Sequence, residues 1–446
     1  MHALVNEKFY KLAQKIAEKG GRMFIVGGAV RDYYLGQKPH DIDYCITGIS
    51  EEELTDMVNI SRVQGNSFPV YIIDGCEVAL ARVERKIGIG HTKFDIETDK
   101  KISIEQDLAR RDITINSMAI DVLTGDLVDP FHGLDDIQHG IIRHTTKVFI
   151  EDPLRVYRVA RFASKFGYEV APETIEIMES MNNELSSLSP ERVFAEMRKA
   201  LVTENPELFF QVLKRANVLE IHFKEISDLI GVEQPLEYHP EGDVFNHTME
   251  VLKIVSKMTS NAQIGSQEEL IRFCALVHDF GKALTPREEW PHHYGHEKRG
   301  EEPIHNFCKR IRASSLFEKA GKLIARTHMK AGKIKSLRPG SIVKLFEEIS
   351  KSRSISFLGV EIIAIADSKD ETIKFAKLAE EVMKIRATKE LISKCTKDGV
   401  LDYMKLKEII MQERVVFVKD NIQEIQGTTL KSIATIVCTN KEVKDD

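Results

Sequence analysis

The chain has 446 residues, more than one hydrophobic core ordinarily serves, so we expect two to four domains. Apolar residues make up 42% of the chain and charged residues 30%, and no apolar run approaches the roughly 20 residues of a membrane-spanning helix. The composition therefore indicates a soluble globular protein without a membrane partner. The formal net charge of −6 does not by itself indicate a nucleic-acid partner.

The first residues lack the pattern of a signal peptide. The six cysteines are scattered along the chain and form no Cys-x-x-Cys pair; they are Cys45, Cys76, Cys274, Cys308, Cys395 and Cys438. This usage argues for a reducing compartment and against a cysteine-ligated zinc site. We therefore expect a cytoplasmic protein.

Helical spacing over residues 5–19 stops at a Gly-Gly pair, and the apolar run at 23–26 then predicts a buried strand. The segment GGAVRD follows at residues 27–32. Its two glycines allow the backbone to approach a phosphate closely, with free N–H groups facing it. Taken alone, such a pair is more often an ordinary turn.

Asp41 and Asp43 lie two residues apart, so on a strand both carboxylates project from the same face. Two carboxylates on one face suit Mg²⁺, which takes few protein oxygens and leaves room for substrate phosphates. In-line attack at a nucleotide phosphate commonly uses a pair of such ions. The alternative is an acidic pair that arose by chance.

GGAVRD and the Asp-x-Asp pair together resemble the signature of the class II tRNA nucleotidyltransferases and bacterial poly(A) polymerases. The resemblance implies a nucleotidyl-transfer head in which Gly28 and Arg31 contact the incoming nucleotide. It also implies that Asp41 and Asp43 are catalytic and hold the metal ions.

Two further strands are predicted at residues 68–73 and 77–81, across an Asp-Gly turn. Glu77 is either a third carboxylate for the metal ions or an ordinary strand-edge acid. Residues 84–107 are polar, contain two glycines and show little periodicity, so we predict a mobile loop. In the family that the chain resembles, a flexible loop at this place helps to switch specificity between nucleotides.

The segment RRDITIN, residues 110–116, offers forked guanidinium donors for a triphosphate in Arg110 and Arg111. Asp112 and Asn116 can either hold ribose hydroxyls or orient the arginines. The competing interpretation is a charged helix start with Asp112 as its N-cap. Resemblance to the family's motif favours nucleotide binding.

A proline at residue 153 predicts a helix start with Asp152 as its cap, and Arg155 and Arg158 then share a helix face. The segment resembles the motif by which the family is thought to read the incoming base, through Glu151, Asp152, Arg155 and Arg158. A carboxylate can accept from the exocyclic amine that C and A carry and that U and G replace by oxygen. The alternative is a solvated charged face.

Residues 172–230 are helical by period, and the loop at 232–243 has the composition of a domain boundary. A different chemistry follows, in the ordered set His247, His278, Asp279 and Asp367. Imidazoles and carboxylates ligate borderline divalent metals well. The spacing alone does not choose between Asp367 and the nearby Asp370.

This ordered set resembles the HD phosphohydrolase superfamily, which implies that His247, His278, Asp279 and Asp367 are metal ligands. His296 and His328 become candidates for a second site or for phosphate contacts, and Lys282 becomes a candidate phosphate contact. Between residues 305 and 353 the chain carries thirteen Lys or Arg against three acids. Such a run is usually a solvated helical face, with an RNA-binding surface as the second interpretation.

Both motif sets together resemble the long bacterial form of the CCA-adding enzymes, with a C-terminal HD domain. The resemblance implies a multidomain α+β fold: a small mixed α/β head, then an all-α neck and body, then an all-α HD domain. The expected divisions are residues 1–140 for the head, 141–231 for neck and body, 243–370 for the HD domain and 371–446 for a helical C-terminal region.

The implied activity is the template-independent addition of C, C and A to tRNA 3′ ends from CTP and ATP, with Mg²⁺ in the head. A phosphohydrolase activity on 2′,3′-cyclic or 2′-nucleotides is implied for the HD domain, with Ni²⁺, Co²⁺ or Mn²⁺. We expect tRNA, CTP and ATP as partners, and a monomer or weak homo-oligomer. Three alternatives are a poly(A) polymerase, an enzyme that adds only A, and an HD phosphohydrolase with a tRNA-binding head.

Overall fold

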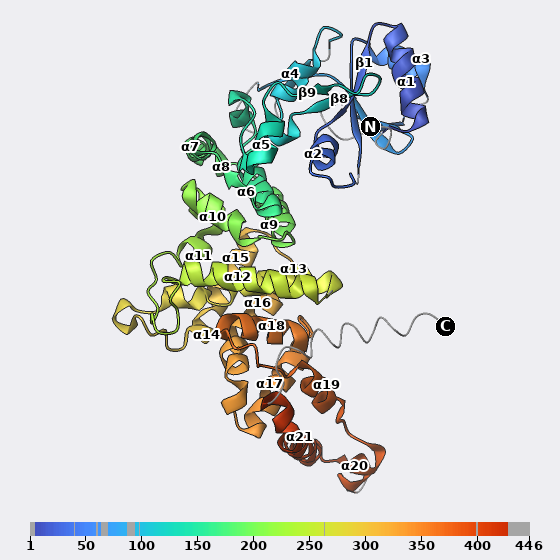
Figure 1. Cartoon of the computed structure of the whole chain (residues 1–446). Helices are drawn as coiled ribbons and strands as arrows, with labels where there is room; N and C mark the ends of the chain where they lie inside the picture. Colours follow the sequence, from blue (N-terminus) through green and yellow to red (C-terminus); the bar gives the residue numbers. More distant parts are fainter. Residues whose placement is uncertain are drawn as a thin grey trace. The chain divides into compact units, whose positions relative to one another are not determined.

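The computed structural model describes residues 5–39, 41–58, 61–63, 70–86, 94–97, 99–262, 264–397 and 400–426. The chain forms two compact units (Figure 1). Unit 1 comprises Met1–Ala200 and Leu208–Ile221, and unit 2 comprises Leu201–Glu207 and His222–Asp446. Unit 1 holds a mixed sheet and helices, whereas unit 2 is almost entirely helical. The predicted fold class, a mixed α/β head followed by all-α parts, is confirmed.

A seven-stranded sheet organises unit 1, in the order β3-β4-β5-β2-β1-β8-β9. Its strands are β1 (Arg22–Val26), β2 (Asp43–Thr47), β3 (Ser61–Val63), β4 (Val70–Ile73), β5 (Cys76–Leu80), β8 (Ala119–Asp121) and β9 (Leu127–Val128). Strand β1 is antiparallel to both β2 and β8, and β2 is parallel to β5. The register pairs Val26 with Asp43 and Tyr44 with Val78, which brings the starts of β2 and β5 to one edge.

Apolar spacing explains how α1 (Glu7–Glu18) covers the sheet. Its buried residues Phe9, Leu12, Ala13 and Ile16 recur every three or four positions and so form one helical face. The Phe9 ring stacks on Tyr44 of β2 with 4.2 Å between centroids. Burying such an aromatic side chain contributes about 1.5–3 kcal/mol, so this face fixes the helix to the sheet.

The prediction of a mobile loop over residues 84–107 is wrong for the part that the structure describes. Strands β6 (Val83–Lys86) and β7 (Phe94–Glu97) pair as an antiparallel ribbon, and α4 (Ile104–Ala109) follows. Helix α4 begins with a capping box, in which Ser103 and Gln106 each accept a hydrogen bond from the other's backbone N–H. Residues 87–93 and 98 lie outside the described ranges.

The rest of unit 1 is mostly helical and contains the segments predicted to bind the nucleotide. Its elements are α2 (Gly28–Tyr34), α3 (Glu51–Met57), η1 (Thr114–Asn116), α5 (Gly133–His139), β10 (Ile141–Ile142), η2 (Lys147–Glu151), α6 (Leu154–Phe166), β11 (Glu169–Val170), α7 (Pro172–Ser180), α8 (Asn182–Leu185), α9 (Pro190–Leu201) and α10 (Glu207–Arg215). The helical spacing predicted from residue 172 onward is confirmed by α7 to α10 and by α11 (Leu219–Ser227).

Unit 2 is built around packed helices, with α12 against α13 and α18, and α16 against α15 and α18 (Figure 1). Its elements are α12 (Val244–Asn261), η3 (Gly265–Gln267), α13 (Glu268–Val277), η4 (Phe280–Leu284), η5 (Arg287–Glu289), α14 (His296–Arg299), α15 (Glu301–Arg310), α16 (Ser315–Gly332), η6 (Ile334–Ser336), α17 (Pro339–Ser352), α18 (Phe357–Ser368), α19 (Ala376–Lys384), α20 (Lys389–Lys394), β12 (Thr396–Lys397), β13 (Val400–Leu401) and α21 (Tyr403–Gln426). None of the helices in the described ranges is long and apolar enough to cross a membrane.

A fully buried arginine, Arg272 of α13, ties together several backbone segments of unit 2. Its guanidinium donates to the carbonyl oxygens of Leu201, Thr203 and Ser256, at 2.6–3.0 Å, and forms an ion pair with Glu268. A buried carbonyl without a donor is costly, so this one side chain satisfies a set of groups that apolar packing cannot satisfy.

We expect Arg272→Ala to lower the free energy of unfolding of unit 2 by at least about 3 kcal/mol, since several buried acceptors each lose a bond worth roughly 1–3 kcal/mol. Trp290 is the only tryptophan of the chain and belongs to unit 2, so its fluorescence during urea unfolding measures this loss. Lys257→Ala on the exposed face of α12 is the control and should leave the transition in place. An unchanged transition in Arg272→Ala would contradict the assignment.

Candidate active sites

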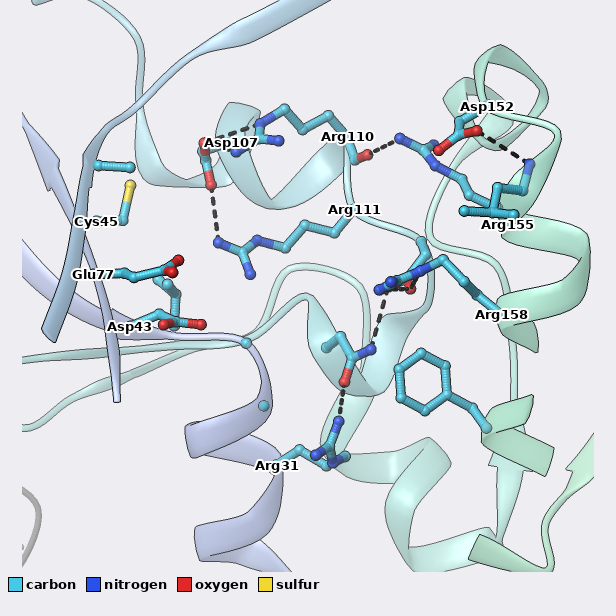
Figure 2. Close-up of a pocket in the computed structure, with 18 of the residues that line it drawn as sticks. Arg31, Asp43, Cys45, Glu77, Asp107, Arg110, Arg111, Asp152, Arg155 and Arg158 are labelled. Atoms are coloured by element: carbon cyan, nitrogen blue, oxygen red, sulfur yellow. Dashed lines mark hydrogen bonds and ion pairs between the residues drawn. The ribbon is translucent and has the colours of Figure 1, made fainter. Parts of the chain in front are cut away.

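A cavity in unit 1 collects most of the residues predicted to bind the nucleotide (Figure 2). They come from α2, β2, η1 and α6, and from the segments that precede η1 and α6. The predicted residues that line it are Gly28, Arg31, Asp43, Arg110, Arg111, Asp112, Asn116, Asp152, Arg155 and Arg158. Asp41 and Glu151 are not among the lining residues.

One wall of this cavity is acidic. Asp43 begins β2 and Glu77 lies on the parallel neighbour β5, and Figure 2 shows their carboxylates side by side. The pKa of Asp43 is raised, mainly because the surrounding protein desolvates its carboxylate, and further because Glu77 and Asp41 are negatively charged. The positive charge of Arg111 opposes this shift. Carboxylates that repel each other in this way form a suitable place for a divalent cation.

Asp41 stands apart from this wall in one respect. It lies at a bend, before β2 begins at Asp43. The expectation that both aspartates share a strand face is therefore wrong, because the strand begins two residues too late. Asp41 is nonetheless close enough for its charge to raise the pKa of Asp43.

The opposite wall is basic. Arg110 Nη2 lies 2.7 Å from Asp107 Oδ1, and Arg111 Nη2 lies 3.3 Å from Asp107 Oδ2, so one buried carboxylate holds both guanidinium groups. Burial alone would raise the pKa of Asp107, but the arginines lower it overall. Gly27 has a φ of +71°, and a Cβ there would lie 2.7 Å from Arg111 Nη1. A glycine at this turn therefore leaves room for the arginine.

A chain of hydrogen bonds links α2, η1 and α6 across the cavity. Arg31 Nη1 donates to Asn116 Oδ1 at 2.5 Å, and Asn116 Nδ2 donates to Asp112 Oδ1 at 3.2 Å. Arg158 closes the chain with two nitrogens 2.8 and 2.6 Å from Asp112 Oδ2. Despite burial, Arg158 lowers the pKa of Asp112. This geometry favours a role for Asp112 and Asn116 in orienting the arginines, and Asp112 does not cap a helix.

Asp152 lies just before α6, whose N-cap is Pro153 and not Asp152 as predicted. Its Oδ1 accepts a hydrogen bond from Leu154 N at 3.1 Å and lies 3.8 Å from Arg192 Nη2. Arg155, by contrast, donates to the backbone carbonyls of Val148 and Arg110, at 2.8 and 2.6 Å. Asp152 therefore faces the cavity with a carboxylate, whereas Arg155 also fixes the local backbone.

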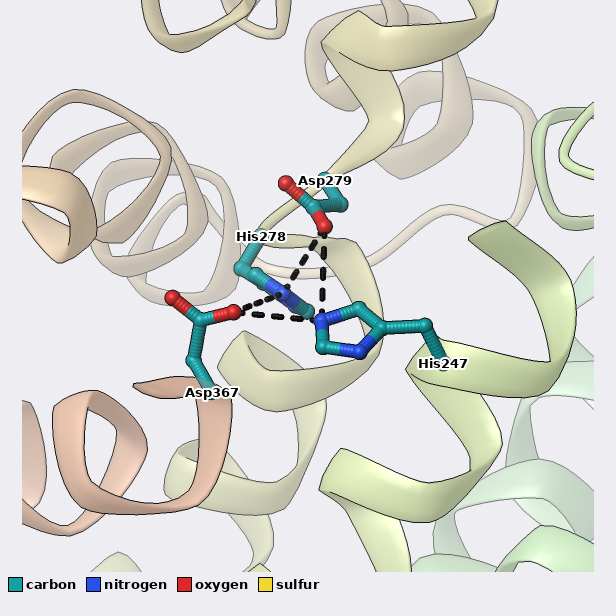
Figure 3. Close-up of side chains that lie close together, drawn as sticks. All are labelled: His247, His278, Asp279 and Asp367. Carbon is teal, nitrogen blue, oxygen red and sulfur yellow. Dashed lines mark hydrogen bonds and ion pairs between the residues drawn. The ribbon is translucent and has the colours of Figure 1, made fainter. Parts of the chain in front are cut away.

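In unit 2, the four predicted HD ligands converge (Figure 3). His247 comes from α12, His278 and Asp279 from the end of α13, and Asp367 from α18. Their candidate ligand atoms all lie within 4.8 Å of one another. His247 Nε2 lies 3.1 Å from Asp367 Oδ1, and His278 Nε2 lies 3.2 Å from Asp279 Oδ2.

The structure also distinguishes the two candidate aspartates on this side of unit 2. Asp370 pairs with Lys335, whose Nζ lies 2.9 Å from its Oδ2, and it caps the turn at Thr372. Asp367 instead points at the two histidines. The geometry therefore supports Asp367 as the candidate ligand.

The HD cluster fits a divalent cation. His278 Nε2 and Asp279 Oδ1 are buried, and within the described part of the chain neither has a hydrogen-bond partner of acceptable geometry. Such groups are costly to bury unless something else satisfies them. Burial would lower the pKa of His278, but Asp279 and Asp367 raise it to about 10. Positive charge is thus favoured at the place where a cation would lie.

A second group shares Asp279 with the first. His296 Nε2 and His328 Nε2 lie 3.2 Å apart and 3.4 and 3.6 Å from Asp279 Oδ1. Burial lowers the pKa of His328 to about 4, so its imidazole is neutral and able to ligate. Lys282 Nζ lies 2.6 Å from Asp279 Oδ2. All the residues predicted for the HD site therefore meet in one place.

Close packing accounts for how the His278–Asp279 corner is held. A Cβ on Gly281 would lie 2.0 Å from the carbonyl oxygen of His296 and 2.6 Å from the backbone nitrogen of Gly300. The turn after α13 thus contacts the backbone around α14 directly, which places His296 beside Asp279. Only glycine permits this approach.

Comparison with known proteins places this arrangement in a family. Residues 23–143 match the model of the poly A polymerase head domain, 167–230 that of the probable RNA and SrmB-binding site of polymerase A, and 244–372 that of the HD domain. The multifunctional CCA protein of Nitrosococcus oceani is 36% identical over 414 residues, which cover 91% of this chain and all of that protein. The chain belongs to the CCA-adding enzymes. The namesake from Shewanella frigidimarina is 43% identical over 334 residues, covering 73% of this chain and 78% of that protein.

Solved CCA-adding enzymes share the fold. The Thermotoga maritima enzyme complexed with tRNA has a TM-score of 0.62 at 18% identity and covers 98% of this chain and 97% of its own. A CCA-adding enzyme complexed with ATP has a TM-score of 0.61 at 19% identity, covering 92% and 91%. The family predicted from the motifs is thereby confirmed, and with it the assignment to the tRNA nucleotidyltransferases.

Several cavity residues of this CCA-adding enzyme were missed by sequence reasoning. Asp107 and Arg192 carried no signal, because each becomes relevant only through a tertiary contact. Glu77 was left open, and the parallel pairing of β2 with β5 now sets it beside Asp43. Near the HD cluster, Gln234 and Glu241 were assigned to a linker.

Proposed function

We propose that the cavity of unit 1 adds C, C and A to the 3′ end of tRNA, using CTP and ATP. The observation that carries this proposal is one cavity with an acidic wall at Asp43 and Glu77 and a basic wall at Arg110 and Arg111. Acidic groups suit the metal ions, and forked guanidinium donors suit a triphosphate. The names of the relatives support the reaction.

In this proposal Asp41 and Asp43 hold Mg²⁺, with Glu77 as a further carboxylate at the same edge of the sheet. The bound ions would polarise the α-phosphate and help the tRNA 3′ hydroxyl to attack it. Arg110 and Arg111 would bind the triphosphate, since Asp107 holds both guanidinium groups toward the cavity. Gly28 would admit the phosphates close to the backbone.

The remaining cavity residues would orient the nucleotide. Arg31 would contact it from α2, while Asn116 and Asp112 keep Arg31 and Arg158 in place. Asp152, together with Glu151, Arg155 and Arg158, would read the base edge. Side chains thereby replace a nucleic-acid template.

Asp152→Ala should relax the discrimination against UTP and GTP, because the carboxylate that accepts from an exocyclic amine is gone. A good base-edge pair is worth roughly 1–3 kcal/mol, so the ratio of kcat/KM for CTP over UTP should fall about tenfold or more. Asp126→Ala, an exposed carboxylate that does not line the cavity, is the control. A lower kcat with unchanged selectivity would make Asp152 merely structural.

The overall reaction is tested with three tRNA transcripts, which lack the terminal CCA, the terminal CA or only the terminal A, each incubated with CTP and ATP. A CCA-adding enzyme completes all three. An enzyme that adds only A extends just the transcript that already ends in CC, and a poly(A) polymerase continues beyond one A. The lengths of the products from the three transcripts therefore distinguish these enzymes from one another.

For unit 2 we propose metal-dependent hydrolysis of small phosphoesters such as 2′,3′-cyclic or 2′-nucleotides. His247, His278, Asp279 and Asp367 would hold the ion, and His296, His328 and Lys282 would form a second site or contact the phosphate. His278 Nε2 and Asp279 Oδ1 are buried and have no hydrogen-bond partner of acceptable geometry among the described residues, which supports a metal there. Imidazole ligands favour Ni²⁺, Co²⁺ or Mn²⁺ over Mg²⁺.

The same proposal includes the organisation of the chain. We assign residues 1–140 to the head, 141–231 to neck and body, 243–370 to the HD domain and 371–446 to a helical C-terminal region. Partners would be tRNA, CTP and ATP, and the enzyme would act in the cytoplasm as a monomer or weak homo-oligomer.

A further inference from the structure

The segment at 232–243, predicted as a domain boundary and outside the HD match at 244–372, contacts the HD site repeatedly. Gln234 Oε1 accepts from Lys282 Nζ at 2.7 Å, and the Glu233 carbonyl oxygen lies 2.8 Å from His293 Nε2. Glu241 Oε1 lies 2.7 Å from His247 Nδ1. Two of these contacts reach residues of the HD site, Lys282 and His247, and the third reaches the neighbouring His293. The segment is therefore part of the site and not only a linker.

The contact between Glu241 and His247 reaches a candidate ligand directly. The His247 side chain is fully buried. Its Nδ1 contacts Glu241 Oε1, and its Nε2 lies 3.1 Å from Asp367 Oδ1. The two ring nitrogens thus face opposite ways, one toward the segment at 232–243 and the other into the cluster of Figure 3.

The chemistry of Glu241 determines what this contact does. An ionised carboxylate can only accept hydrogen bonds, so its histidine partner must carry the proton on Nδ1. A neutral imidazole with Nδ1–H keeps its lone pair on Nε2, which is the nitrogen that faces the other ligands. Lys369 Nζ lies 2.8 Å from Glu241 Oε2 and stabilises the ionised form.

Two neighbours hold this pair in place. The His239 ring packs edge-on against His247, with 4.6 Å between centroids, and its Nδ1 lies 3.3 Å from Glu241 Oε1. These three side chains are close enough to ligate a cation of their own. The ammonium group of Lys369 at Glu241 argues against that, because it already supplies the positive charge.

We infer that Glu241 is a positioning residue of the HD site, which fixes the His247 tautomer that presents Nε2 to a divalent cation. The inference rests on the proposed metal-dependent function of unit 2. A carboxylate that accepts from the second nitrogen of a ligating histidine also makes the ligating nitrogen more basic. Loss of such a partner typically weakens metal binding by about 10–100-fold.

The test is Co²⁺ binding to the full chain, measured by calorimetry and by the visible absorption bands of the bound ion. We expect Glu241→Ala to weaken binding by about 10–100-fold. Glu241→Gln keeps the size of the side chain but can also donate to Nδ1, which favours the wrong tautomer, so binding should weaken and the bands should shift. Glu237→Gln, the same change at an exposed position of the same segment, should bind as the parent does.

The outcomes separate the two proposals. If Glu241→Gln binds Co²⁺ within twofold of the parent and with the same bands, the positioning role is wrong while the metal site stands. If the parent binds no Co²⁺, the metal-dependent function fails and the inference fails with it. Trp290 fluorescence checks that each variant is folded; should Glu241→Ala unfold, Glu241→Gln decides.

Discussion

Replacing Asp43 with alanine will abolish nucleotide addition to tRNA, and Asp41→Ala will do the same. Asp43 stands beside Glu77 on the acidic wall of the cavity, and desolvation, followed by the charges of the neighbouring carboxylates, raises its pKa. A cation bound there would neutralise this wall. Losing a metal ligand removes several kcal/mol of transition-state stabilisation, which corresponds to a fall of about a thousandfold or more in kcat. Single-turnover extension of a tRNA transcript lacking its terminal A measures this.

The control for this prediction is Asp56→Ala, an exposed carboxylate on α3 of the same unit that does not line the cavity. It should extend tRNA at the parent rate. Co²⁺ binding by unit 2 should persist in both Asp43→Ala and Asp41→Ala, because the HD residues belong to the other compact unit. Parent rates of addition in Asp43→Ala would overturn the metal assignment, whereas parent rates in Asp41→Ala alone would transfer its role to Glu77.

Local sequence was enough to place residues whose role depends on neighbours in the chain. The Gly-Gly turn, the RRDITIN segment and the start of α6 each appear where spacing and capping chemistry predict them, and the cavity gathers them. Asp152 lines the cavity and accepts a hydrogen bond from Leu154 N, the first residue of α6, although the N-cap position itself falls on Pro153. Motifs of this kind carry their geometry within a few residues.

Roles that depend on contacts between residues far apart in the chain could not be predicted from local sequence. Whether Asp112 binds ribose or orients arginines depends on Arg158, which lies 46 residues further along the chain. The choice of Asp367 over Asp370 depends on Lys335, which pairs with Asp370. Glu241 resembled part of a linker because only the folded chain brings it to His247.

Two predictions near the cavity were wrong, one about where strand β2 begins and one about where a helix begins. Asp41 and Asp43 were expected on one strand face, but β2 begins only at Asp43. Residues 84–107 were expected to be a loop because the segment is polar and without period. The capping box of Ser103 and Gln106 was the local signal that a helix starts there.

The double substitution His278→Ala, Asp279→Ala should erase the phosphoesterase activity proposed for unit 2 and leave CCA addition at the parent rate. His278 and Asp279 supply two of the four converging ligands, and Asp279 also belongs to the group with His296 and His328. Removing both therefore disrupts both candidate metal positions. The measurement is hydrolysis of 2′,3′-cyclic AMP with Ni²⁺, Co²⁺, Mn²⁺ or Mg²⁺, and the loss should be at least about a hundredfold, since a metal ion contributes several kcal/mol.

Because both side chains are buried, the nearly isosteric Asp279→Asn is the second variant, and it should lose the activity without loss of the native Trp290 fluorescence. The control is His292→Ala, an exposed histidine of the same unit that belongs to neither ligand group. If the parent hydrolyses no phosphoester with any of these metals, unit 2 is instead a helical support for tRNA. The basic stretch at 305–353 would then be its contact surface, and charge reversals of Lys330 and Lys333 there would weaken tRNA binding at low salt.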